Sequence, residues 1–335
     1  MDKIVYIFIC FLLIAFILIG CGNNNATVKN DKLSIVATIF PEYDWVCEIL
    51  GDKVKNVEVT MLLDNGVDLH SYQPTINDIA KISDCDMFIY VGGESDGWVN
   101  DALKNAKNDK MKVINLLEVL GDSVKTEELI EGMQEEEHDH HHEEITEEKH
   151  EHEYYEEEKD EHVWLSLKNA KILCKVIADN LSEIDPENKD IYSANVSTYI
   201  EKLSVLDEEY KKMVNGSNRK IVLFGDRFPF RYLVDDYGID YYAAFVGCSA
   251  ETEASFETVA FLSKNTDELK LPCVLTIEGA NHKIAETVVA NTYSKNQKVF
   301  TMDSMQSTTS SDVKNGITYI FVMEKNLDIL REALK

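Results

Sequence analysis

Seven of the nine histidines in this chain fall in one acidic stretch, Glu131–Trp164. Few apolar residues accompany them, so the stretch cannot build a packed core of its own. Imidazole and carboxylate at this density suit divalent transition metals, zinc above all. A merely solvated loop would more often consist of Glu, Lys and Ser, so the composition favours metal handling. The histidines expected to collect metal at low affinity are His138, His140, His141, His142, His150 and His152.

Two other histidines are better placed for one ordered site. His162 closes the acidic stretch just before Trp164, and His70 lies upstream in the loop Asp68-Leu-His70-Ser-Tyr-Gln-Pro74. Taken alone, each would more often be an exposed or structural histidine. Together they suit Zn²⁺, which neutral imidazole binds through one nitrogen while the other is held by a carboxylate or carbonyl. A single flexible loop cannot supply one ordered tetrahedral site, so the stretch alone does not account for tight binding.

Apolar segments and helical patterns alternate along the chain, which predicts parallel strands with helices on both faces. In such sheets ligands bind at the carboxyl ends of the strands, and His70 lies in a loop of that kind. The expected strands are 33–40, 57–63, 87–91, 113–116, 220–224, 241–245, 273–277 and 298–301.

One long helix is expected between the two halves. From Tyr192 to Met213 apolar residues recur at steps of three and four, with Pro186 at the start and Gly216 at the end. Such a helix would be about 43 Å long, which favours a rigid link over an ordinary surface helix or a coiled-coil arm. The predicted fold is α/β: two lobes, each with a mostly parallel sheet of about four strands flanked by helices, joined by one long rigid helix. The expected segments are an N-terminal lobe at 31–185 with a disordered His/Glu-rich loop at 127–161, a linking helix at 186–215 and a C-terminal lobe at 216–335.

The first residues predict an extracytoplasmic location. Lys3 precedes the apolar run Ile4–Ile19, and Leu18-Ile19-Gly20-Cys21 resembles a bacterial lipobox. We therefore expect a signal peptide at 1–20, lipidation at Cys21 and a tether at 21–30. An uncleaved membrane anchor is the alternative, and it would place the rest of the chain on the same side.

Charge and missing motifs exclude several classes of protein. The net charge is −28, and residues 131–161 hold 16 Asp and Glu against 2 Lys. Such acidity repels nucleic acid and anionic lipid, which leaves the lipid anchor as the membrane contact. There is no nucleotide-binding glycine loop and no serine-hydrolase elbow. The scattered cysteines Cys47, Cys85, Cys174, Cys248 and Cys273 argue against a zinc ribbon and leave one disulfide open.

The combination of the lipobox, the Asp68–Pro74 loop, the His/Glu-rich insertion, Glu161-His162-Val-Trp164 and the long helix resembles a known family. It is similar to the metal-binding lipoproteins that serve bacterial ABC importers of zinc and manganese. The resemblance covers essentially the whole mature chain. It implies two α/β lobes with a metal in the cleft between them, and a receptor rather than an enzyme.

The resemblance also implies one ligand from each of four loops. His70 and His162 match the two ligands of the first lobe, and Asp303 matches an acidic ligand near the last strand. The match for the remaining ligand is weaker. The family usually has His or Glu where this chain reads Phe224-Gly-Asp226-Arg-Phe-Pro229. Asp226 is the first candidate there, although it would serve equally as a helix N-cap. Glu253, Glu278 or a water molecule are alternatives for this position, and His282 is expected on a helix surface.

These observations predict a lipid-anchored, extracytoplasmic and monomeric Zn²⁺ receptor. It would pass its cargo to an ABC permease driven by an ATPase. Manganese or iron is the alternative cargo, since two histidines and carboxylates also fit Mn²⁺, and the histidine-rich stretch favours zinc. A zinc hydrolase with Glu278 as base is disfavoured because no His-Glu-x-x-His helix is present. Surface adhesion has no sequence signature that would favour or oppose it.

Overall fold

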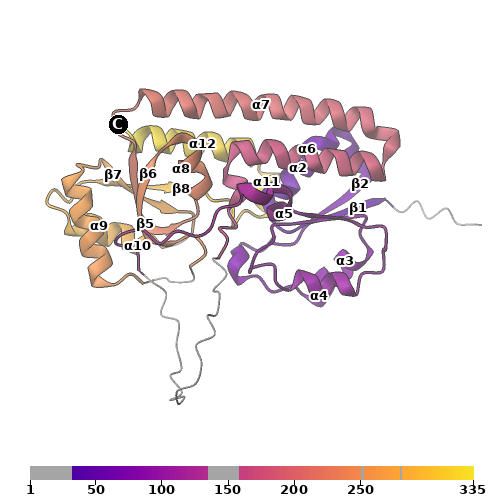
Figure 1. Ribbon diagram of the computed structural model, residues 1–335, viewed down its shortest axis with the longest axis horizontal. Coiled ribbons are helices and arrows are strands. Elements are labelled where there is room, and N and C mark those ends of the chain that lie inside the picture. The colour runs from indigo at the N-terminus through magenta and orange to yellow at the C-terminus, as the bar shows by residue number, and fades with distance from the viewer. Residues whose placement is uncertain (1–31, 135–157, 250–252, 280) are drawn as a thin grey trace, which may run out of the picture. The chain divides into compact units, whose positions relative to one another are not determined.

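The computed structural model describes residues 32–134, 158–249, 253–279 and 281–335. Residues Leu33–Lys335 form one unit built on two four-stranded sheets, whose strands are all parallel (Figure 1). We call the part around the first sheet the first lobe and the part around the second sheet the second lobe. The first sheet has the order β2 (Val57–Met61), β1 (Leu33–Ala37), β3 (Met87–Tyr90) and β4 (Lys112–Asn115). The second repeats this order with β6 (Asp240–Val246), β5 (Ile221–Phe228), β7 (Cys273–Ile277) and β8 (Lys298–Met302).

The helices of the first lobe begin where short polar side chains cap them. Thr75 caps α3 by accepting from the Asp78 backbone N–H, and Ser166 caps α6 in the same way through Asn169. Both caps follow from the sequence, because each residue immediately precedes a helical apolar pattern. The helices of this lobe are α2 (Phe40–Leu50), α3 (Ile76–Asp84), α4 (Val99–Lys104), α5 (Leu116–Leu120) and α6 (Leu167–Ile184).

The long helix α7 (Lys189–Gly216) runs along both lobes (Figure 1). A single 3-10 turn, Pro186–Asn188, precedes it, so the proline lies just before the α-helix and not in its first turn. Its 28 residues give a length of about 42 Å. The apolar stripe that the sequence shows is its buried face: Tyr192, Val196, Tyr199, Leu203, Leu206 and Tyr210.

Strand β5 is longer than the sequence predicts. The apolar run ends at Phe224, but pairing with β6 resumes at Arg227 after a bulge. Gly225 lies in this bulge, where a Cβ would come within 2.5 Å of the backbone of α10 (Lys283–Asn291). Glycine is therefore what lets α10 pack against the strand. The next helix is α8 (Arg231–Tyr237). The other helices of the second lobe are α9 (Phe256–Glu268), α11 (Ser310–Lys314) and α12 (Tyr319–Ala333).

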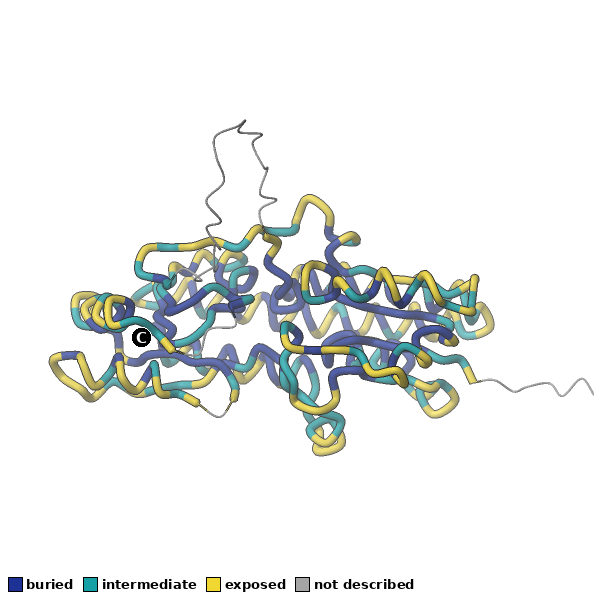
Figure 2. Tube along the Cα trace, turned by 90° about the horizontal axis from the view of Figure 1, so that it is seen from below, coloured by how far each residue is buried: buried dark blue, intermediate teal, exposed yellow. Residues whose placement is uncertain are grey.

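Apolar packing joins the two lobes. One continuous cluster of buried side chains contains residues of both sheets, and Figure 2 shows the buried trace passing through both. Trp164 of the first lobe donates through Nε1 to the Ser304 carbonyl at 2.8 Å, and its own carbonyl accepts from the Tyr319 hydroxyl at 2.7 Å. Tyr319 also packs edge-on against Trp45 of α2. An extensive apolar interface opposes relative motion of the two lobes, so we expect any hinge motion between them to be small.

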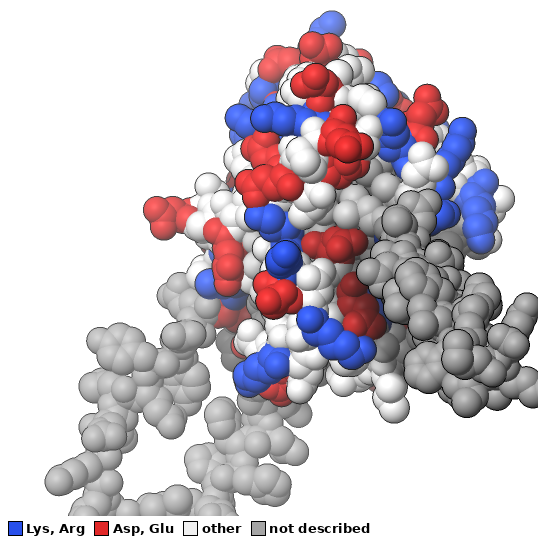
Figure 3. Space-filling view, turned by 90° about the vertical axis from the view of Figure 1, so that its right-hand side faces the viewer, with Lys and Arg blue, Asp and Glu red and all other residues white. Residues whose placement is uncertain are grey.

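The surface is mixed in charge over the part that the structure describes. On the end face shown in Figure 3, lysine and arginine alternate with aspartate and glutamate. Cys47, Cys85, Cys174, Cys248 and Cys273 are free thiols. None of the helices in the described residues is long and apolar enough to cross a membrane. The predicted signal peptide, Cys21 and the tether lie outside the described residues, as do His138, His140, His141, His142, His150 and His152.

Candidate metal centre

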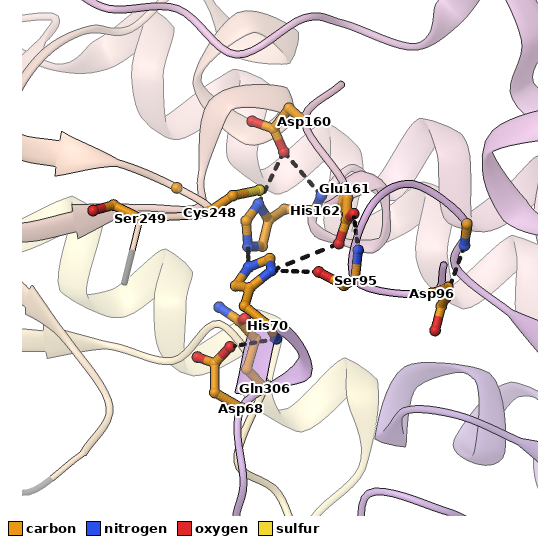
Figure 4. Close-up of polar contacts among 12 residues, drawn as sticks. Asp68, His70, Ser95, Asp96, Asp160, Glu161, His162, Cys248, Ser249 and Gln306 are labelled. Carbon is orange, nitrogen blue, oxygen red and sulfur yellow. Dashed lines mark hydrogen bonds and ion pairs between the residues drawn. The ribbon is translucent and has the colours of Figure 1, made fainter. Parts of the chain in front are cut away.

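His70 lies in the loop after β2, within one turn of 3-10 helix, Leu69–Ser71. The Asp68 carboxylate caps this turn by accepting from the His70 backbone N–H at 3.0 Å. The ring is fixed at Nδ1, which lies 2.7 Å from Ser95 Oγ and 3.6 Å from Glu161 Oε2. With Nδ1 engaged, the ring presents Nε2 toward His162 (Figure 4).

His162 is fully buried and is held in the same manner. Asp160 Oδ1 lies 2.9 Å from the ring Nδ1 and also accepts from the His162 backbone N–H at 2.9 Å. A Cβ at Gly247 would stand 3.0 Å from the ring, so the second lobe approaches this face through a residue without a side chain. Nε2 of His162 remains, 3.3 Å from Nε2 of His70.

The separation of these two nitrogens fits a shared metal ion. Zn–N bonds of about 2.0–2.1 Å at a tetrahedral angle place two ligand nitrogens about 3.3 Å apart. His70 and His162 already have this spacing, and the other nitrogen of each ring faces a carboxylate or hydroxyl oxygen. Such partners fix the tautomer and direction of metal-binding imidazoles.

The surroundings shift the pKa values of the two imidazoles in opposite directions. Burial, followed by the neighbouring His162, lowers the pKa of His70 to about 3. Burial alone would lower the pKa of His162 too, but the Asp160 carboxylate and its hydrogen bond outweigh burial and raise it. A divalent cation binds unprotonated imidazole nitrogens, so its binding at these two atoms would compete with protonation of the pair.

The second lobe brings a thiol to the histidines. Cys248 follows β6, and its Sγ and the ligand atoms of His70 and His162 all lie within 4.8 Å of one another. Figure 4 shows the sulfur beside the His162 ring. Glu127 holds the loop that carries this thiol, since its carboxylate accepts from the backbone N–H of Cys248 at 3.1 Å.

A guanidinium connects the loops of the two lobes. Arg227 Nη2 donates to Asp68 Oδ2 at 2.6 Å, and Nη1 donates to the Ser249 carbonyl at 3.2 Å. Burial alone would raise the pKa of Asp68, but the charges of Arg227 and His70 and their hydrogen bonds together outweigh burial and lower that pKa. With its amide nitrogen turned toward Asp68, Gln306 donates to the same carboxylate at 3.1 Å. The His70 loop is thus tied to the loop that carries Cys248.

A second cluster of possible ligands, Glu127, Asp160 and His162, serves to position the first. Asp160 already binds the ring and backbone of His162, and Glu127 accepts from the backbone of Gly247 and Cys248. These contacts place the two carboxylates where they hold the His162 ring and the Cys248 loop in position.

Asp303 and Asp226 belong to neither cluster in the part of the chain that the structure describes. Asp303 accepts from the Met305 N–H at 2.8 Å, and burial raises its pKa. Asp226 lies in the β5 bulge, where its carboxylate accepts from the Thr276 hydroxyl and the Arg227 N–H.

The remaining alternatives lie elsewhere in the second lobe. Burial, followed by the charge of Asp303, raises the pKa of Glu278 to about 7, and its carboxylate accepts from both Ser304 N and Oγ. His282 stands at the start of α10 with its ring against Thr276 Oγ1 at 3.2 Å. Glu253 is likewise in neither cluster among the described residues.

Sequence reasoning missed Cys248, Glu127, Asp160 and Arg227. Cys248 had one usable signal, because it follows the second strand of its lobe as His70 follows the second strand of the first lobe. Glu127 and Asp160 were hidden among many similar carboxylates. Arg227 could not be separated from a surface charge without knowing that β5 continues past its bulge.

Both ends of the histidine-rich stretch lie against the site. Residues 127–134 and 158–161, which the sequence places inside the loop, have defined partners. Thr126 and Lys159 form an antiparallel bridge, and Tyr232 of α8 accepts from the Lys125 N–H and donates to the Asp160 carbonyl. Gln134 donates to the Ala244 carbonyl at 2.9 Å. Glu127 and Asp160, on the two sides of the stretch, have ligand atoms within 4.8 Å of that of His162.

Known proteins resemble this chain over almost its whole length. The chain is 34% identical over 323 residues to the zinc-binding lipoprotein AdcA of Streptococcus pneumoniae serotype 4, covering 96% of this chain and 59% of that protein. It is 31% identical over 329 residues to the high-affinity zinc uptake system protein ZnuA of Bacillus subtilis, covering 97% of this chain and 95% of that one. The crystal structure of the Zn(II)-bound ZnuA-like domain of Streptococcus pneumoniae AdcA superimposes with a TM-score of 0.68 at 29% identity, over 90% of this chain and 99% of that domain.

These likenesses confirm the predicted fold of two parallel α/β lobes with one long helix, and the predicted resemblance. The chain spans 59% of the length of AdcA, so AdcA has further sequence that this chain does not match. The matching family model is described as zinc-uptake complex component A, periplasmic, which is a binding component and not an enzyme, and it covers residues 35–333. The chain belongs to this family of periplasmic zinc-uptake components.

Proposed function

We propose that this protein is the extracytoplasmic Zn²⁺ receptor of an ABC importer, with the cation held between the lobes. The observation that carries the proposal is the pair of facing Nε2 atoms of His70 and His162, 3.3 Å apart, each on a ring fixed from its other side. Family membership and the zinc-binding relatives support it.

His70 and His162 are the proposed ligands from the first lobe. Asp226 and Asp303 stay predictions for the second lobe. Each already accepts hydrogen bonds from neighbouring groups, and neither lies in a ligand cluster among the described residues. The proposed segments are those expected from the sequence: lobes at 31–185 and 216–335, with the linking helix at 186–215.

The cellular arrangement is also a proposal. Lipidation at Cys21 would keep the receptor at the outer face of the cytoplasmic membrane, from which it passes zinc to a permease and its ATPase. The histidines from His138 to His152 would collect zinc at low affinity. The anchoring of both ends of their stretch beside His162 supports this role, because collected ions would be released close to the tight site.

Competitive zinc titration against a chromophoric chelator tests the function, on protein purified without a polyhistidine tag. The wild type should bind one equivalent of Zn²⁺ tightly. His70→Ala should lower the affinity for that equivalent by more than about 100-fold, because loss of a supporting residue alone typically lowers metal affinity 10- to 100-fold. His282→Ala is the matched control, since its ring lies outside the cluster. An unchanged tight equivalent in His70→Ala would refute the assignment.

A further inference from the structure

We propose that Cys248 is the metal ligand of the second lobe, and that it binds the cation as a thiolate beside His70 and His162. This inference rests on the proposed zinc-receptor function and deepens it. It replaces the acidic or histidine ligand expected near Asp226 with a sulfur ligand from a different loop.

The geometry brings the thiol within reach of the histidine pair. In a tetrahedral zinc site, Zn–S of about 2.3 Å and Zn–N of about 2.0–2.1 Å place sulfur and nitrogen about 3.6 Å apart. The ligand atoms of His70, His162 and Cys248 already lie within 4.8 Å of one another. An adjustment of about 1 Å, within the reach of one side-chain rotation, therefore completes a three-ligand shell.

The loop that carries Cys248 is held from several sides. The Glu127 carboxylate of the first lobe accepts from the Gly247 N–H at 3.4 Å and the Cys248 N–H at 3.1 Å. Arg227 binds the next carbonyl, that of Ser249, and reaches Asp68 in the His70 loop. Every one of these contacts fixes the thiol relative to the histidines. Such preorganisation is expected of a ligand and unnecessary for a cysteine that only fills space.

The surroundings of the thiol suit a cation and oppose a free thiolate. Burial, followed by the charges of Glu127 and Asp160, raises the pKa of the Cys248 thiol, so without metal it stays protonated and is a poor nucleophile. A divalent cation reverses this effect, because its charge outweighs those of the carboxylates. On coordination the S–H bond breaks, the sulfur lone pair forms the bond to the metal and the proton passes to water.

No other described side chain of the second lobe competes for this position. Asp226 and Asp303 lie in neither ligand cluster, and Arg227 occupies the stretch where the family resemblance implies a ligand. A thiolate is also a softer ligand than a carboxylate. It favours Zn²⁺ and Cd²⁺ over Mn²⁺, which bears on the alternative cargo.

Optical titration with Co²⁺ or Cd²⁺ tests the inference directly, because thiolate-to-metal charge transfer gives a near-ultraviolet band that histidines and carboxylates do not give. In the wild type we expect this band to rise to one equivalent and stop. It should vanish in Cys248→Ser, which keeps the side-chain volume, and in Cys248→Ala. Cys47→Ser is the matched control, since Cys47 is also a half-buried free thiol, on α2, and should leave the band intact.

Zinc affinity and alkylation supply independent readouts. Cys248→Ser should lower the affinity for the tightly bound Zn²⁺ by about 100-fold or more. Bound Zn²⁺ should slow carboxymethylation of Cys248, mapped by peptide mass spectrometry, and leave that of Cys47 unchanged. If the wild type binds one tight Zn²⁺ but shows no band, and Cys248→Ser binds as tightly, Cys248 is not a ligand while the receptor function stands. If the wild type has no tight equivalent, both proposals fall.

Discussion

His70 follows β2 in the first lobe, and Cys248 follows β6, the strand in the same position of the second sheet. The two loops are supported differently. The His70 loop is held largely by its own lobe, through the Asp68 cap and Ser95. The Cys248 loop is held by Glu127 of the first lobe and by Arg227 of its own lobe, which also binds Asp68 of the first lobe. The comparison teaches that the first lobe builds its half of the site and also positions the other half.

The largest effect should follow from changing the buried histidine of the first lobe. His162→Gln keeps roughly the volume but loses the ring, so tight zinc binding should fall by more than about 100-fold. The Asp160 carboxylate would lose its buried ring partner, at a cost of about 3 kcal/mol in the free energy of unfolding. Chelator competition and urea unfolding measure the two effects. Unchanged zinc affinity would refute the assignment of His162 as a zinc ligand.

A change of ligand type in the second lobe should alter which metal is preferred. Cys248→Asp replaces a soft ligand by a hard one, so zinc affinity should fall and the ratio of manganese to zinc affinity should rise by roughly tenfold. Competitive titration of both metals measures this ratio. Cys47→Asp is unsuitable as a control because it buries a charge on α2, and Cys47→Ser serves instead. An unaltered ratio would mean that the second lobe selects its cargo through another residue.

Loss of the connection between the lobes should have a smaller effect. Arg227→Met keeps the side-chain length but removes both the Asp68 and Ser249 contacts. We expect zinc affinity to fall by about tenfold, which is the lower end of the effect of supporting residues, with faster zinc dissociation. Stopped-flow release into excess chelator measures that rate. Arg331→Met is the control, since Arg331 is an exposed residue of α12 that pairs with the exposed Asp328 on the same helix. An equal rate in both variants would mean that the second lobe holds its ligand without this connection.

The smallest effect on the tight site should come from deletion of residues 135–157. The contacts of residues 127–134 and 158–161 would remain, so the affinity of the tight equivalent should stay within about threefold, while additional weak equivalents are lost. Isothermal titration separates the two classes. A longer deletion that includes Asp160 should weaken the tight site as well, because it removes the partner of His162 Nδ1. Equal effects of the two deletions would contradict the supporting role of Asp160.

Local patterns predicted most of the fold. The eight apolar runs became the eight strands, and Thr75 and Ser166 became the caps that their positions imply. The end of β5 was missed because the polar residues Asp226 and Arg227 resemble the end of a strand. The pairing of Arg227 with Phe245 is a long-range contact that leaves no local pattern.

The candidate site also contains residues that the sequence singled out and one that it did not. His70 could be singled out because histidine is rare outside the acidic stretch, and His162 because it closes that stretch just before Trp164. Cys248 could not, since an isolated cysteine is more often a small buried hydrophobe. Its proximity to the two histidines exists only after the second lobe has packed against the first.

By itself the sequence determined the two alternating α/β halves, the long helix between them, the metal-binding character and the two histidines. These features rest on composition, periodicity and short motifs, which act over a few residues. The tertiary structure alone decided that the two Nε2 atoms lie 3.3 Å apart, that Glu127 holds the backbone of Cys248, and that the thiol of a loop not singled out by the sequence lies beside the histidines. Those outcomes depend on contacts between residues far apart in the sequence, such as His70 with His162, 92 positions away, and His70 with Cys248, 178 positions away. Only the packing of the lobes sets such distances.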